Sequence, residues 1–182
     1  MAKFNYAQYQ EEGVRKPDKG TPAYFAQKYD IARKNLLSVV VFTTINVILL
    51  LLNSSMYMLF SAAIPYYFPA IATVIDNELL SGHTLTIIAY AVSLASILFY
   101  LLCWQFSRER RGWMIAALVV FILDFLVLIA FMLLSSPADF LLDIAFHIWV
   151  VWYLISGVRN SKKLLRAVQE NPPASVYSGP EF

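Results

Sequence analysis

The chain has 182 residues, of which 59% are hydrophobic and only 14% are charged. Soluble domains carry about 25% charged residues, so this composition excludes the ordinary soluble classes and indicates an integral membrane protein. The formal net charge of +2 is too small for a nucleic-acid-binding protein. The single cysteine, Cys103, excludes an intrachain disulfide and a cysteine-rich zinc site.

The N-terminal region is polar and is expected to stay outside the hydrocarbon core. We assign residues 1–20 to a polar arm, and we expect no cleavable signal because the first apolar run begins late and is long. Thr21 and Pro22 have the chemistry of a helix start, with threonine as the cap and proline in the first turn. Aromatic and basic residues alternate after them, which favours an amphipathic helix on the inner membrane surface over residues 21–35.

Four apolar segments are long enough, or nearly so, to cross a hydrocarbon core of about 30 Å. None contains lysine, arginine or an internal proline, and a backbone in lipid must satisfy its own hydrogen bonds, so each is predicted to be helical. The sequence therefore predicts an all-α fold, a four-transmembrane-helix antiparallel bundle occupying residues 36–157. The predicted spans are residues 36–52, 84–104, 113–134 and 140–156.

A fifth apolar segment, residues 56–75, differs from these four in its prolines. Pro65 and Pro69 each remove a helical hydrogen bond, and Tyr66 and Tyr67 between them favour the headgroup level. We predict a broken segment on the outer side of the bundle, and the sequence leaves open whether it is interfacial or re-entrant.

All fourteen basic residues lie in three of the five polar regions. The positive-inside rule therefore places both termini in the cytoplasm of a cell whose plasma membrane holds the chain. Residues 158–170 are expected to form a basic cytoplasmic helical extension, and residues 171–182 a disordered tail. The basic residues are Lys3, Arg15, Lys16, Lys19, Lys28, Arg33, Lys34, Arg108, Arg110, Arg111, Arg159, Lys162, Lys163 and Arg166.

The stretch ARKNLLSVVVFTTINVILLLLNSSMYMLFSAAIPYYFP, residues 32–69, has a basic turn, one long helix and then an aromatic and proline-rich segment. This arrangement resembles the opening of a group of small, uncharacterised polytopic bacterial membrane proteins. The resemblance covers about a fifth of the chain. It implies a polytopic membrane protein and brings no assigned activity.

Asp124 is the clearest polar residue within a predicted span, close to the middle of residues 113–134. An aspartate there costs about 2.5–3.5 kcal/mol on insertion scales, whereas each Leu, Ile, Val or Phe contributes roughly −0.3 to −0.6 kcal/mol. That span holds fifteen such apolar residues, so insertion is still favoured. We expect Asp124 to face the bundle interior, a cavity or a partner protein.

The other candidate site residues are expected to face the same interior. His147 and Asp143 are four apart and share a helix face, and the short link after residue 134 brings their helix alongside that of Asp124. The first span carries a polar stripe of Thr43, Asn46 and Asn53, and the second carries one of Thr86, Tyr90, Ser93, Ser96, Tyr100 and Cys103. These stripes predict a polar seam or a narrow wet cavity, while plain hydrogen bonding between helices also explains the serines and threonines.

Three functions are compatible with this pattern. The preferred one is a protein, or a transporter subunit, that binds or moves a small molecule or a cation in its polar seam. The second is an accessory protein in which Asp124 binds a membrane partner or another copy of the chain. The third is an intramembrane acid–base enzyme. No cofactor, metal-binding or catalytic motif is present, and the acidic outer residues match no metal spacing.

Overall fold

The computed structural model describes residues 17–80, 82–134 and 140–170. In this part of the chain every regular element is a helix, and four helices are long and apolar enough to cross a membrane, namely α1, α3, α4 and α5. The predicted all-α, four-span membrane class is therefore confirmed. The elements are α1 (Pro22–Leu51), α2 (Ile64–Ile75), the π-helical turn η2 (Asp76–Leu80), α3 (Thr84–Phe106), α4 (Gly112–Leu134) and α5 (Leu141–Glu170).

The first helix is longer than predicted. Thr21 is its cap, as expected, because its hydroxyl accepts a hydrogen bond from the Tyr24 amide at 3.2 Å. However, α1 continues for 30 residues without interruption, so the separate surface helix over residues 21–35 is wrong. After Pro22 in its first turn, α1 contains neither glycine nor proline. One face of its early turns packs against the rest of the protein and is buried there. The predicted tail, most of the polar arm and the link at residues 135–139 lie outside the described residues.

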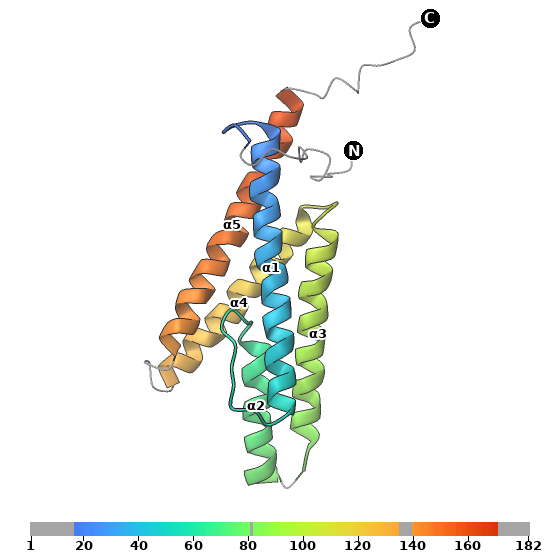
Figure 1. Ribbon diagram of the computed structural model, residues 1–182. Coiled ribbons are helices and arrows are strands. Elements are labelled where there is room, and N and C mark those ends of the chain that lie inside the picture. Colours follow the sequence, from blue (N-terminus) through green and yellow to red (C-terminus); the bar gives the residue numbers. More distant parts are fainter. Residues whose placement is uncertain (1–16, 81, 135–139, 171–182) are drawn as a thin grey trace, which may run out of the picture.

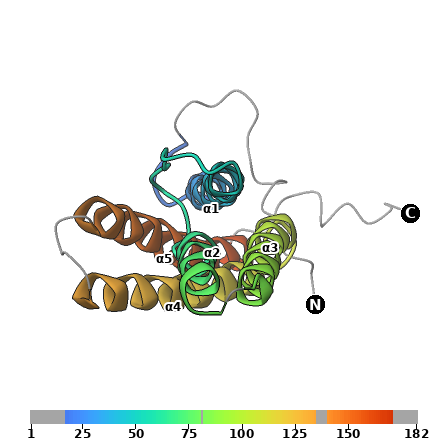
Figure 2. The same cartoon turned by 90° about the horizontal axis from the view of Figure 1, so that it is seen from below.

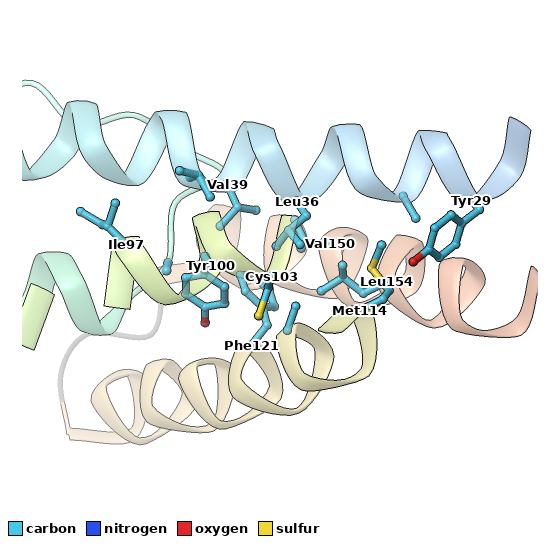
Figure 3. Close-up of a cluster of buried hydrophobic side chains, with 14 of the residues drawn as sticks. Tyr29, Leu36, Val39, Ile97, Tyr100, Cys103, Met114, Phe121, Val150 and Leu154 are labelled. Atoms are coloured by element: carbon cyan, nitrogen blue, oxygen red, sulfur yellow. The ribbon is translucent and has the colours of Figure 1, made fainter. Parts of the chain in front are cut away.

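The spanning helices run alternately up and down the molecule (Figure 1). Helix α1 packs chiefly against α5 and also contacts α3, whereas α4 joins α3 to α5. Side chains from all four helices meet in one apolar core, including Leu36 of α1, Tyr100 of α3, Phe121 of α4 and Leu154 of α5 (Figure 3). The core holds one end of the bundle together. At the other end α4 and α5 diverge from α1 and α3.

The contact between α1 and α5 is tightest at Gly157. A Cβ atom placed on Gly157 would lie 2.6 Å from the Cβ of Ala32, well inside van der Waals contact. Because Ala32 is fully buried and its Cβ cannot rotate away, the helices approach this closely only with glycine at position 157. Small residues at membrane-helix interfaces serve this purpose.

Gly157→Ala is therefore expected to lower the free energy of unfolding by about 1–3 kcal/mol, the usual cost of overpacking. SDS titration of the purified protein in micelles measures this value. Ala32→Gly in the same chain should restore most of the loss. Gly112→Ala is the matched control, because nothing lies within 4 Å of a Cβ at that position. Equal effects of the two glycine substitutions would contradict the close approach.

After α1 the chain turns back along its own helix. The side chain of Asn46 holds Met58 at both backbone groups, donating to its carbonyl and accepting from its amide, each at 2.7 Å. Two residues before α2, the Ala62 amide donates to the hydroxyl of Thr43 at 2.8 Å. Residues 52–63 thus run from the end of α1 back toward its middle, and α2 then returns in the opposite direction (Figure 1).

Helix α2 fills the wedge left by the diverging helices. Viewed from below, it lies between α3 on one side and the α4–α5 pair on the other, beneath α1 (Figure 2). Its principal packing partner is α3. The predicted broken segment is therefore an extended chain followed by a half-length helix of 12 residues.

The two prolines of α2 are accommodated without an unpaired backbone group between them. Pro65 lies in the first turn, where an amide would have no helical partner. Pro69 lacks the amide that would bind the carbonyl of Pro65. The hydroxyl of Ser93 on α3 lies 2.8 Å from that carbonyl and 2.9 Å from the Ala89 carbonyl of its own helix, so its single proton can be donated to the Pro65 carbonyl instead. The serine of the predicted polar seam therefore completes a helix rather than lining a cavity.

Ser93→Ala should destabilise the protein by about 1–2 kcal/mol, because the Pro65 carbonyl would be buried without a donor. Pro69→Ala returns the missing amide, so Ser93→Ala should cost clearly less in that background. Ser96→Ala is the control, since the Ser96 hydroxyl donates only to Val92 in its own helix. A double-mutant cycle measured by SDS titration tests this, and purely additive effects would refute the compensation.

The C-terminal end of α3 is completed by α1. Arg33 is buried there, and its guanidinium donates to the Trp104 carbonyl at 2.9 Å and to the Ser107 hydroxyl at 3.0 Å. Tyr29 donates to the Ser107 carbonyl at 2.7 Å. Because the last carbonyls of a helix lack intrahelical donors, these two side chains fix α3 against α1.

Candidate functional site

Asp124 is almost wholly buried midway along α4 and accepts hydrogen bonds from the first amides of α2. Its Oδ2 accepts from Ala63 and its Oδ1 from Ile64, each at 2.8 Å. The first amides of a helix have no intrahelical acceptor and carry the positive end of the helix dipole. The carboxylate of Asp124 therefore caps α2, as an anion bound at a helix N-terminus does.

His147 of α5 meets the same carboxylate. Its Nε2 lies 3.2 Å from Asp124 Oδ2, and both side chains are only 2% exposed. The other ring nitrogen, Nδ1, lies 2.7 Å from the backbone carbonyl of Asp143. The rings of Phe121 and Phe125 lie nearly parallel to the imidazole, with centroids 5.1 and 5.6 Å away. The aromatic pair shields the imidazole from surrounding lipid and solvent.

Asp143 lies one helical turn from His147 and is held by two tyrosines, Tyr57 of residues 52–63 (the fold-back region) and Tyr67 of α2. Tyr57 donates to its Oδ1 at 3.3 Å and Tyr67 to its Oδ2 at 3.1 Å. The Tyr57 hydroxyl also lies 3.1 Å from that of Ser61, which in turn accepts from Asn46 at 2.8 Å. Side chains from α1, α2, α5 and residues 52–63 are thus joined in one polar network.

The structure brings together four of the five predicted site residues. Asp124 and His147 are in direct contact, and Asp143 and Asn46 belong to the connected network. Tyr90 does not: it lies partly exposed on α3 and has no hydrogen bond to the network among the described residues. Ser93 and Tyr100 of the same stripe are buried, but at the turn of Tyr90 the buried position is taken by Ala89, one residue earlier.

The network also contains groups that the sequence did not identify. The most important are the backbone amides of Ala63 and Ile64, which have no sequence signal of their own. Tyr57, Ser61 and Tyr67 were not predicted either. The prolines of α2 were the available indication, because proline favours the first turn of a helix. A helix that begins inside the segment needs acceptors for its first amides.

At the turn between η2 and α3, Asp76 also caps a helix. Its Oδ2 accepts from the amide of Thr86 at 2.7 Å, in the first turn of α3. Desolvation raises the pKa of the Asp76 carboxyl, but the hydrogen bonds from Thr86 and Leu85 outweigh it, so the pKa lies below the ordinary value. Asp76 Oδ1 and Thr86 Oγ1 have no hydrogen-bond partner among the described residues. Predicted outer residue Asp139 lies outside them.

The polar network does not contribute to the surface groove beside α2. That groove, of about 340 Å³, lies between α2, α3 and α4, and its lining, from Phe68 and Ile75 to Leu85 and Phe131, is apolar. Neither Asp124 nor His147 contributes to it. Within the described residues, no three His, Cys, Asp or Glu side chains come close enough to hold a metal ion. The carboxylates, imidazole and hydroxyls of the site can form hydrogen bonds and exchange protons.

Comparison with protein-family models, with curated proteins and with solved structures finds no match to this chain.

The two buried aspartates should respond differently to conversion into asparagine. Asp124→Asn puts an amide NH₂ against backbone amides that can only donate, so we expect a loss of about 3 kcal/mol or more. Asp143→Asn faces tyrosine hydroxyls, which can donate or accept, so we expect a loss within about 1 kcal/mol. SDS titration of both variants measures the difference. A similar loss in the two would contradict the capping role of Asp124.

Proposed function

We propose that the protein is a transport-related membrane protein, or the membrane subunit of a transporter, that binds a small solute or cation within the bilayer at the Asp124–His147 network. The observation that carries the proposal is the start of α2 on a buried carboxylate midway along a spanning helix. A helix that begins at this level places irregular backbone at membrane depth, where its polar groups need hydrogen-bond partners within the protein. A bundle with a purely structural role can be built from continuous helices without this requirement.

Non-helical backbone at membrane depth is tolerated only where protein buries it or where it lines a cavity. Discontinuous helices in secondary transporters use it to place helix termini at the midplane, where they bind ions and substrates. Residues 52–63 and α2 have this form: an extended entry, a half-length helix and an acidic residue at its N-terminus. We therefore propose that the broken segment is re-entrant rather than interfacial.

The other two hypotheses receive less support. An accessory protein that binds a partner through Asp124 needs this carboxylate on the outside of the bundle, whereas it is buried and bonded on both oxygens. An acid–base enzyme needs a pocket in which substrate reaches the carboxylate or the imidazole, and the apolar groove contains neither. Binding of a small species within the network is the remaining use of its chemistry.

We further propose that the protein lies in a bacterial plasma membrane, with the start of α1, the α3–α4 turn and the end of α5 in the cytoplasm. These three regions lie at the same end of the molecule (Figure 1). Among the described residues, every lysine and arginine lies in the regions at that end, and the turns at the other end have none, as the positive-inside rule requires.

The orientation can be tested with a matched pair of cysteine variants. His83→Cys and Glu109→Cys lie at opposite ends of α3, and both positions are exposed. Neither change alters the number of lysines and arginines. We expect a membrane-impermeant maleimide to label Cys at position 83 in intact cells and at position 109 only after lysis. Wild type, whose Cys103 is fully buried, is the unlabelled control, and the reverse pattern would invert the topology.

Transport itself can be tested in proteoliposomes on a solid-supported membrane, with concentration jumps of H⁺, Na⁺ and K⁺. We expect at least one jump to give a current that Asp143→Asn retains in part and Asp124→Asn abolishes. Folding of each variant is checked by size-exclusion elution. If well-folded wild-type protein gives no current with any of the three ions, or if Asp124→Asn leaves the current unchanged, the cation-transport proposal is wrong.

A further inference from the structure

The hydrogen bonds around His147 fix how many protons the site holds. A backbone carbonyl can only accept, so the 2.7 Å contact with the Asp143 carbonyl requires the proton of Nδ1. If the imidazole were neutral, Nε2 would then present a lone pair to Asp124 Oδ2 at 3.2 Å. Two lone pairs cannot form this contact, so an additional proton must lie between the two atoms.

The surroundings of Asp124 decide which atom carries that proton. Its two oxygens already accept from the Ala63 and Ile64 amides, and the N-terminal end of α2 favours negative charge. On the other side, the faces of Phe121 and Phe125 flank the imidazole, and aromatic faces attract cations. Both environments favour transfer to nitrogen, giving an imidazolium and a carboxylate.

We infer that Asp124 and His147 form a proton-binding site within the membrane domain, occupied as an imidazolium–carboxylate pair that also holds the start of α2. Release of the proton leaves two facing lone pairs, so Nε2 and Oδ2 must separate. Because the same Oδ2 accepts the hydrogen bond of the Ala63 amide, proton release is coupled to the hydrogen bonding that holds the start of α2. The proton is then the cation of the proposed transport function. Its part in transport rests on that function, whereas the proton site itself does not.

The other titratable groups around the pair come from α2, α3, α5 and residues 52–63. Tyr100 of α3 is buried close to Asp124, Asp143 precedes His147 by one turn of α5, and Tyr57 and Tyr67 bind Asp143 from the fold-back region and α2. Asn46, the group from α1, is uncharged. Asp143 and its two tyrosines lie on the outer side of the pair, where they provide the nearest groups for proton exchange.

The proton can be detected directly because the chain has only two histidines. With ¹⁵N-histidine-labelled protein in micelles at about pH 7.5, a solvated imidazole is mostly neutral. By contrast, we expect His147 to show a one-bond N–H coupling on both ring nitrogens. Asp143→Asn should keep both couplings, whereas Asp124→Asn should lose the one on Nε2. An unprotonated Nε2 in wild-type protein overturns the inference, whatever the variants do.

The coupling to α2 is tested in the same sample by raising the pH. The amide resonances of Ala63 and Ile64 should shift with the same midpoint as the loss of the Nε2 proton. The Met58 amide, which binds the uncharged Asn46, is the internal control and should not shift with that midpoint. Independent midpoints would refute the coupling. This outcome does not depend on ion currents, so failure of the transport proposal remains distinguishable from failure of the proton site.

Discussion

The capping of α2 by Asp124 is the interaction on which the rest of the membrane domain depends. A helix cannot begin within an apolar bundle unless its first amides have acceptors, since each unpaired amide costs several kcal/mol in hydrocarbon. Asp124 supplies two acceptors and Thr43 supplies the one before them. With its start fixed in this way, α2 occupies the space between α3 and the α4–α5 pair, and the divergence of these helices is filled.

Much of the architecture was predictable because it follows from bulk physical chemistry. Span number follows from hydropathy, and the need to keep Asp124 away from lipid follows from its insertion cost. The short link after residue 134 brings the helix of His147 alongside that of Asp124. The continuity of α1 was not predicted, because polar residues such as Arg33 suggested a water-exposed surface. Arg33 instead completes the C-terminal end of α3, a role that depends on tertiary contact and leaves no local pattern.

The polar side chains of the predicted seam bind main chain of the segment that enters the bundle. Thr43, Asn46 and Ser93 were expected either to line a cavity or to join neighbouring helices. Ser93 joins α3 to α2, and Thr43 and Asn46 bind the extended chain before α2. Sequence patterns show which side chains face inward, but they do not show that an extended main chain will enter the bundle to meet them. The carbonyl that Pro69 leaves unpaired is the exception, since a proline four residues after any carbonyl requires an outside donor.

A single carboxylate that serves both a helix terminus and an imidazolium links two events that would otherwise be independent. The amides of Ala63 and Ile64 hold Asp124 whether or not His147 is charged, so α2 alone would give a permanent structure. His147 alone, on a regular helix, would give a titrating group without consequence for the backbone. Oδ2 is shared between Ala63 and His147, so the loss of one proton changes the hydrogen bonding at the start of α2. Within the described residues, the polar contacts of α2 with other elements lie at this end and at Ser93 and Asp143. A small protein can couple protonation to the movement of a buried segment with no more parts than these.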